Sequence, residues 1–311
     1  MNDSMLPYMQ QDIVNEILAL KQEKDAVILA HYYVRPEVQA IADYIGDSFY
    51  LSKIATKLDA QTIVFAGVFF MGESAKVLNP DKTVLLPDMK ANCAMAHMAD
   101  VATIEKMRAQ YEDLAVVCYI NSTAELKQHS DVCVTSSNAV KIVKALPNKH
   151  IFFIPDRNLA RYVAAQVPEK QFVFNEGYCP IHEAILISEL QEVKIAHPEA
   201  LILAHPECKK ELLDLADYTG STLGIIEFAT KSDAKEFIIC TENGIRYELE
   251  QKNPDKTFYF TKTEPVCPDM KTITLEKIRD VLKYGNNDVQ VTDRLREQSQ
   301  KPLSRMLELG K

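Results

Sequence analysis

The stretch Val27-Ile-Leu-Ala-His31, followed by Ala42-Asp-Tyr-Ile-Gly-Asp-Ser48, decides the fold because the chain repeats its pattern twice more. In each copy an apolar run ends at one residue, here called the marker, from which the spacings are counted. The three markers are His31, Tyr119 and His205. An aspartate follows each marker after 12 residues, a hydroxyl side chain after 17, and a second apolar run after 32. The aspartates are Asp43, Asp131 and Asp217, and the hydroxyl residues are Ser48, Ser136 and Thr222. A repeat of this length exceeds solenoid periods and predicts three copies of a small domain.

Short apolar runs alternate with amphipathic segments in each copy, which is typical of βαβ units and a parallel sheet. In the first copy the pattern predicts strands at 26–30, 62–66 and 83–86, a helix from Pro36 to just before Gly46, a helix starting near Ser48, and a helix at 72–78. We therefore expect an α/β protein of three α/β/α domains, related by a pseudo-three-fold axis around a central active site. Each domain should hold a small four-stranded parallel sheet.

The repeat also predicts domain boundaries. The expected domains are residues 1–92, 93–178 and 179–267. Residues 268–311 lie outside the repeat and show helical patterns at Leu275–Lys283 and Val291–Leu309. We expect this whole C-terminal segment to pack against the first domain.

Composition and charge favour a globular enzyme and oppose several other classes. The chain has 311 residues, of which 47% are hydrophobic and 25% charged, and its net charge is −9. An acidic surface opposes non-specific binding to nucleic acid. No run of eighteen apolar residues occurs, and Met1–Met5 lacks a basic region followed by an apolar stretch. We therefore expect a cytoplasmic protein with neither a membrane nor a nucleic acid as partner.

The seven cysteines divide by context. Cys93, Cys179 and Cys267 lie in loop contexts, 62, 60 and 62 residues after the markers, so a closed three-fold arrangement would bring them together. Three others lie inside apolar runs and are expected to be buried; these are Cys118, Cys133 and Cys240. The sequence pattern assigns no role to Cys208. Three thiolates suit either a catalytic zinc with an open position or a [4Fe–4S] cluster with one iron not bound by protein. The thiolate-only ligand set favours the cluster.

Polar residues follow the first strand of each copy, where the carboxyl ends of parallel strands form sites. They read His31-Tyr-Tyr33, Tyr119-Ile-Asn121 and His205-Pro-Glu207. Ser48, Ser136 and Thr222 are expected at helix starts, where free N–H groups and the helix dipole favour an anion. Each could be a helix cap alone. Three hydroxyl residues at the same position of the repeat favour a pocket for a substrate with several negative charges.

The chain resembles the quinolinate synthase A family over essentially its full length. The matching segments are Ile28-Leu-Ala-His31 with Tyr33, Ile41-Ala-Asp43 with Gly46-Asp-Ser48, Asn79-Pro-Asp81 with Pro87-Asp88, Tyr119-Ile-Asn-Ser-Thr123, Thr135-Ser136 with Asn138-Ala139, Pro155-Asp-Arg-Asn-Leu159, His205-Pro-Glu-Cys208 and Gly220-Ser-Thr222. The resemblance implies condensation of iminoaspartate with dihydroxyacetone phosphate to quinolinate, with loss of phosphate and two waters. It also implies a [4Fe–4S] cluster on Cys93, Cys179 and Cys267, and a functional link to an iminoaspartate-producing oxidase or dehydrogenase. Tyr32 departs from the family, in which asparagine is common at this position.

Roles for the strand-end residues follow from the resemblance and the repeat together. We predict that Tyr33 and Glu207 are the acid–base pair, that Tyr119 positions the intermediate, and that His205 lies in the catalytic site. The predicted substrate-binding residues are His31, Ser48, Tyr119, Asn121, Ser136, His205, Glu207, Ser221 and Thr222. Glu207 could instead be a first-turn helix carboxylate. The competing hypotheses for the whole chain are a non-catalytic protein that binds an anionic metabolite or senses redox state, and a zinc-dependent lyase.

Overall fold

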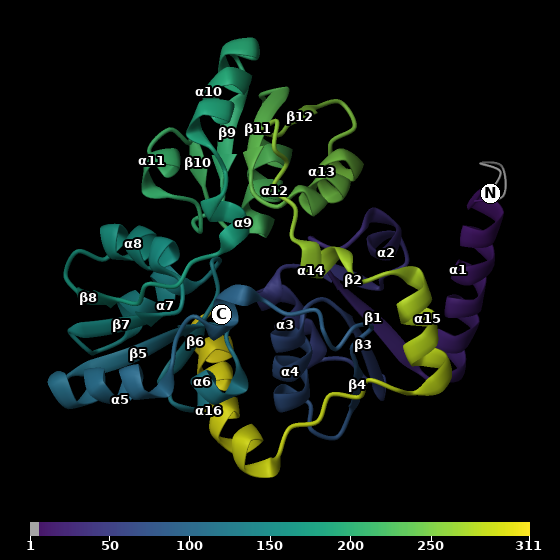
Figure 1. The fold of residues 1–311 in the computed structure, drawn as a ribbon, viewed down its shortest axis with the longest axis horizontal. Helices are drawn as coiled ribbons and strands as arrows, with labels where there is room; N and C mark the ends of the chain where they lie inside the picture. The colour runs from purple at the N-terminus through teal and green to yellow at the C-terminus, as the bar shows by residue number, and fades with distance from the viewer. Residues whose placement is uncertain (1–5) are drawn as a thin grey trace. The chain divides into compact units, whose positions relative to one another are not determined.

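The computed structural model describes residues 6–311 (Figure 1). These residues form two compact units. The first unit contains residues 6–92 and 268–292, and the second contains 93–267 and 293–311. The described residues form three four-stranded parallel sheets, one in the first unit and two in the second. Each sheet has the same order, in which its second strand in sequence is followed by its first, third and fourth. The predicted α/β class with three small parallel sheets is confirmed.

The first unit holds the sheet β2-β1-β3-β4. Its strands are β1 (Ala26–His31), β2 (Tyr44–Gly46), β3 (Thr62–Ala66) and β4 (Thr83–Leu85). Its helices are α1 (Leu6–Glu23), α2 (Pro36–Ala40), α3 (Ser48–Ala55), α4 (Phe69–Leu78), α14 (Pro268–Lys271) and α15 (Leu275–Tyr284). The first and third strands of the sheet are almost entirely buried, as expected for strands covered by helices on both faces.

The second unit begins with the sheet β6-β5-β7-β8. Its strands are β5 (Leu114–Tyr119), β6 (Val132–Val134), β7 (His150–Ile154) and β8 (Gln171–Phe174). The helices around it are η1 (Ala94–His97), α5 (Val101–Gln110), α6 (Ala124–Gln128), α7 (Ala139–Ala145) and α8 (Arg157–Gln166). All six residues of β5 are buried, which places the strand at the centre of this domain.

The second unit continues with the sheet β10-β9-β11-β12. Its strands are β9 (Leu201–Ala204), β10 (Tyr218–Thr219), β11 (Glu236–Cys240) and β12 (Thr257–Tyr259). The helices of this part are α9 (Pro180–Glu183), α10 (Ile187–Ala196), α11 (Lys210–Leu213), α12 (Thr222–Lys231), η2 (Asn243–Ile245) and α13 (Arg246–Lys252). The last helix of the second unit is α16 (Asp293–Leu309), which packs against the sheet that contains β6. Among the residues described, no helix has the length and apolar character needed to cross a membrane.

The repeated aspartates have one structural role in all three copies. The Asp43 carboxylate accepts the backbone N–H of Ile28 at 2.8 Å, and the Asp43 N–H donates to the Ile28 carbonyl at 2.9 Å. The same double contact joins Asp131 to Val116 and Asp217 to Ile202, with carboxylate distances of 2.7 and 2.8 Å. Each aspartate therefore ties the start of the second strand to the first strand of its sheet. This shared role explains the spacing that the sequence repeats.

The short second strand of the first sheet was not predicted. The expected helix from Pro36 to just before Gly46 ends at Ala40, and Tyr44–Gly46 forms β2 beside β1. Three residues are too few to show the alternation that identifies a strand. The strand is defined instead by its pairing, which runs from Leu29 opposite Tyr44 to His31 opposite Gly46.

The C-terminal segment divides between the two units, so the prediction that all of 268–311 packs on the first domain is wrong for its last helix. Helix α15 packs against α1 in the first unit. Helix α16 packs against α6 and β6 in the second unit, where Arg305 donates to the Asp131 carbonyl at 3.1 Å. The apolar side of α16 buries Leu303 and Met306. An amphipathic pattern predicts that a helix face is covered, but not which domain covers it.

Candidate active site

Two histidines lie at the carboxyl ends of equivalent strands and are held in the same way: His31 is the last residue of β1, and His205 directly follows β9. His31 Nδ1 accepts the backbone N–H of Tyr33 at 3.2 Å in the first unit. His205 Nδ1 accepts the backbone N–H of Glu207 at 3.3 Å in the second unit. Because Nδ1 accepts in both rings, Nε2 carries the proton of the neutral imidazole. In the second unit, His205 Nε2 lies 3.2 Å from the Ser136 hydroxyl, to which it donates.

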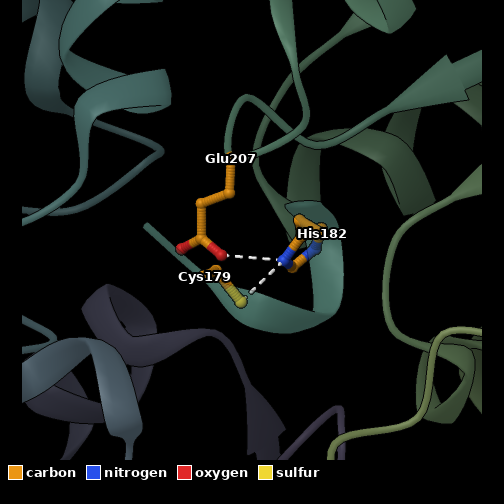
Figure 2. Close-up of side chains that lie close together, drawn as sticks. All are labelled: Cys179, His182 and Glu207. Atoms are coloured by element: carbon orange, nitrogen blue, oxygen red, sulfur yellow. Dashed lines mark hydrogen bonds and ion pairs between the residues drawn. The ribbon is translucent and has the colours of Figure 1, made fainter. Parts of the chain in front are cut away.

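Glu207 is the centre of a buried polar cluster in the second unit (Figure 2). The Tyr119 hydroxyl donates to Glu207 Oε1 at 2.6 Å, and His182 Nδ1 lies 2.8 Å from Oε2. Asn158 donates to the Glu207 backbone carbonyl at 3.0 Å. The alternative role of Glu207 as a helix-start carboxylate is therefore wrong, because the nearest helix begins at Lys210 and the carboxylate binds Tyr119 and His182 instead.

Electrostatics favour an ionised Glu207 beside a neutral His205. Burial opposes ionisation of Glu207, but His182 and the Tyr119 hydroxyl, which both donate to its carboxylate, outweigh burial and lower the pKa of the carboxyl group. Burial also lowers the pKa of His205 to about 3, an effect that the Glu207 charge opposes only in part. A carboxylate that stays charged in a buried site next to donors can accept a proton or orient a substrate hydroxyl.

The three predicted ligand cysteines all belong to the second unit and influence one another. Burial raises the pKa of Cys93 to about 12, and the charges of Glu207 and Cys267 add to the rise. Burial, Glu207 and Cys93 raise the pKa of Cys179 well above its usual range. Thiols in such surroundings ionise readily only when a cationic centre is present, since a metal stabilises the thiolate. The donor set therefore fits a metal centre bound by sulfur.

A smaller group of side chains could by itself hold a single metal ion. Ligand atoms of Cys179, His182 and Glu207 lie within 4.8 Å of one another. Figure 2 shows Glu207 and Cys179 both directed at the His182 ring, with Nδ1 at 3.2 Å from Cys179 Sγ. The other ring nitrogen, His182 Nε2, lies 2.9 Å from the Thr241 hydroxyl, so both nitrogens of the ring have a partner. His182 was not among the predicted site residues, although the Cys179-x-x-His182 spacing places both at one short helix.

The other four cysteines are core residues. Cys118, Cys133, Cys208 and Cys240 are fully buried, and the Cys208 thiol donates to the Cys240 backbone carbonyl. The predicted burial of Cys118, Cys133 and Cys240 is confirmed. Cys208 and Cys240 belong to the apolar core beneath β9 and β11, which gives Cys208 a packing role.

The repeated hydroxyl residues lie near helix starts, with one exception. Ser48 is the first residue of α3 and Thr222 the first of α12, whereas Ser136 lies in a turn three residues before α7 begins. The expectation of a helix start at Ser136 is therefore wrong, and its hydroxyl faces His205 instead. Ser221 caps α12 by accepting the Gly224 N–H at 3.1 Å.

Asn121 offers a buried acceptor without a partner. Its Oδ1 atom is shielded from solvent and forms no hydrogen bond within the described part of the chain. Most buried polar side-chain atoms in proteins are paired, so the Asn121 oxygen has an acceptor position that a donor group of a ligand can fill. Asn121 stands two positions after the marker Tyr119. Tyr33 and Glu207 stand at the same distance from the markers His31 and His205.

Comparison with known proteins gives one consistent family. The model of the family described as "Quinolinate synthetase A protein" matches residues 15–308. A protein named quinolinate synthase from Fusobacterium nucleatum is 54% identical over 95% of this chain and 99% of its own length. Proteins of the same name from Clostridioides difficile and Caldicellulosiruptor bescii are each 50% identical, over 97% and 95% of this chain and 99% and 98% of their own lengths.

Proposed function

The chain belongs to the quinolinate synthase A family of enzymes, and on that premise we propose that it condenses iminoaspartate with dihydroxyacetone phosphate to quinolinate. The reaction releases phosphate and two waters. Iminoaspartate would be supplied by an oxidase or dehydrogenase acting on an amino acid. The observation that carries the proposal is the family match over residues 15–308, together with the hydrogen-bonded group of Tyr119, Glu207, His182 and Cys179.

Cys93, Cys179 and Cys267 would hold a [4Fe–4S] cluster in this proposal. Support comes from the donor chemistry, because the charge of Cys267 raises the pKa of Cys93 and the charge of Cys93 raises the pKa of Cys179. A cluster with three protein thiolates keeps one iron open, and the chemistry that it supplies is Lewis acidity for the loss of a hydroxyl group.

Glu207 would act as the proton acceptor and donor in the second unit. Its carboxylate is ionised, buried, and aligned by Tyr119 and His182, so its basic oxygens keep a fixed direction. Tyr119, bonded to Glu207 at 2.6 Å, would position the intermediate. Tyr33 takes the matching place after β1 and would be the second acid–base group. A positioned acid or base contributes roughly 10²–10⁴-fold to rate.

Anionic groups of the substrates would bind at hydroxyl and amide side chains. Iminoaspartate carries two carboxylates and the triose carries a phosphate, so several donors are required. The residues proposed for this role are His31, Ser48, Asn121, Ser136, His205, Ser221 and Thr222. Support comes from the start of α12, where Thr222 is the first residue, and from the His205 donor at Ser136. The buried Asn121 oxygen would accept a donor from the substrate.

A zinc enzyme is the second candidate, and one observation favours it. Cys179, His182 and Glu207 form a compact group of one sulfur, one nitrogen and one oxygen ligand, a set that catalytic zinc accepts. In that case Glu207 would be a ligand and Cys93 would not bind the metal. The cluster proposal leaves Glu207 for acid–base chemistry and uses all three loop cysteines.

Anaerobic purification with metal and sulfide analysis tests the proposal. The expected result is about four iron and four sulfide per chain, a broad visible absorption, and anaerobic formation of quinolinate. One zinc per chain without sulfide would favour the zinc enzyme. A folded, metal-free chain that binds dicarboxylates without turnover would instead indicate a non-catalytic binding or redox-sensing protein.

A further inference from the structure

The same backbone hydrogen bond joins each cysteine loop to the helical segment that follows the third strand of its copy. The residue 38 positions after each marker donates its N–H to the carbonyl two residues before the cysteine. The three bonds are Phe69 to Ala91, Arg157 to Gly177 and Asn243 to Pro265, each 2.8 Å. The repeat therefore extends to the way in which the three loops are held.

In two of the three copies a buried carboxylate adds a second bond to the cysteine itself. Asp156 Oδ2 accepts the backbone N–H of Cys179 at 3.1 Å, and Glu242 Oε1 accepts that of Cys267 at 3.0 Å. Both acids stand 37 residues after their marker, and both are fully buried. Val68 occupies this position in the first copy and has no carboxylate to offer.

The second oxygen of each carboxylate caps the following helical turn. Asp156 Oδ1 accepts the Leu159 N–H at 2.6 Å, and Glu242 Oε2 accepts the Gly244 N–H at 2.7 Å. One carboxylate thus joins a rigid helix start to the backbone of a cysteine. The fit at the Cys179 loop is tight, since a Cβ at Gly177 would lie 2.5 Å from the Pro155 carbonyl.

We propose that Asp156 and Glu242 are positioning residues that hold Cys179 and Cys267 in the orientation needed to bind the metal centre. This inference rests on the proposed function for the identity of that centre. The two carboxylates hold Cys179 and Cys267 by a side chain as well as by the backbone of their loops. Groups that orient metal ligands typically change metal affinity by about 10–100-fold when they are replaced.

The variants Asp156→Asn and Glu242→Gln test this role because an amide has only one acceptor oxygen. Asparagine is a good helix cap, so Asp156→Asn should keep the bond to Leu159 and lose the bond to Cys179. Asp100→Asn is the matched control, because Asp100 caps α5 in the same unit without contacting a cysteine amide. Circular dichroism checks that all three variants fold.

Two readouts separate the positioning role from general destabilisation. In the metal-free chain, alkylation of each cysteine is followed by mass spectrometry. Asp156→Asn should accelerate modification of Cys179 alone, and Glu242→Gln that of Cys267 alone, each by about tenfold. In the iron-loaded chain, both variants should lose iron to a chelator about 10–100 times faster than the wild type and Asp100→Asn.

Wild-type alkylation rates at Cys179 and Cys267 in the folded variants would overturn the proposal. A uniform rise at every cysteine would also overturn it, because loss of stability acts on the whole unit. The failure of the proposed function is a separate result. A wild-type chain that takes up no iron would contradict the cluster, while the alkylation rates would still decide whether the carboxylates hold the cysteines.

Discussion

The carboxyl ends of β1 and β9 share a backbone arrangement and differ in chemistry. In both, a histidine Nδ1 accepts the N–H of the residue two positions later, at 3.2 Å for His31 and 3.3 Å for His205. That later residue is Tyr33 after β1 and Glu207 after β9. The repeat therefore preserves the direction of the chain at the strand end, while the side chain placed there is specific to each copy.

Replacing the side chain that distinguishes the β9 end should have the largest effect. Glu207→Gln keeps the size of the side chain and one acceptor oxygen but removes the charge that Tyr119 and His182 face. We expect turnover to fall at least about a hundredfold with metal content and folding retained. Steady-state kinetics and iron analysis check this.

The control for that variant is Glu211→Gln, which changes an exposed carboxylate in the first turn of α11. It should leave turnover within about twofold of the wild type, as expected for a surface substitution. Near-normal turnover of a fully loaded Glu207→Gln variant would remove Glu207 from the acid–base role and leave Tyr33 as the main candidate.

The matching change at the β1 end should be smaller. Tyr33→Phe removes a hydroxyl group and leaves the backbone bond to His31 intact, because that bond uses the Tyr33 N–H. We expect turnover to fall by about 10–100-fold, with unchanged metal content. Tyr284→Phe, at a tyrosine that is 67% exposed, is the control and should have no effect. Equal activity of the two variants would restrict the acid–base chemistry to the second unit.

A change in the shared backbone arrangement should affect stability and leave the chemistry unchanged. Asp217→Ala removes the acceptor for the Ile202 N–H, and an unpaired, partly buried N–H costs about 1–3 kcal/mol. We expect a lower free energy of unfolding and an unchanged kcat at a temperature where the variant is folded. Asp214→Ala, which removes an exposed ion pair with Lys210, should cost less than about 0.5 kcal/mol. A large loss of kcat in folded Asp217→Ala would mean that this aspartate also serves the site.

The neutral state of His205 makes stability depend on pH. Its pKa is lowered from 6.5 to about 3, so between these values the unfolded chain binds more protons and stability falls as the pH drops. Between pH 7 and pH 5 we expect His205 to account for a loss of about 1–2 kcal/mol. Unfolding measured at both pH values should show a smaller loss in His205→Asn. The same acid sensitivity in both proteins would contradict a neutral buried His205.

The repeat in the sequence predicts the parts of the fold that it encodes three times. The spacing of Asp43, Asp131 and Asp217 is retained because each carboxylate binds a strand amide, so the three sheets could be expected from sequence. Strand β2 could not, since three residues carry too little periodicity. The docking of α16 on α6 and β6 depends on which domain offers a complementary surface, which the pattern of one helix does not contain.

The sequence pointed to those residues of the candidate site that occupy equivalent positions in the repeated copies. Tyr119, His205 and Glu207 meet in the second unit as strand-end residues. His182 was missed because it occurs in one copy only, and its ring reaches Glu207 from a short helix after Cys179. Asp156 and Glu242 were missed because each resembles an ordinary helix cap until its second oxygen is traced to a cysteine amide.

Anaerobic formation of quinolinate by the iron-loaded chain tests the central claim most directly. Iminoaspartate and dihydroxyacetone phosphate are supplied to the wild type and to Cys179→Ala, and quinolinate is measured by chromatography. We predict product from the wild type and none above background from Cys179→Ala, because a centre with three protein ligands cannot lose one. Absence of quinolinate from a wild-type chain that carries its full iron and sulfide, or equal amounts from both proteins, would contradict the claim.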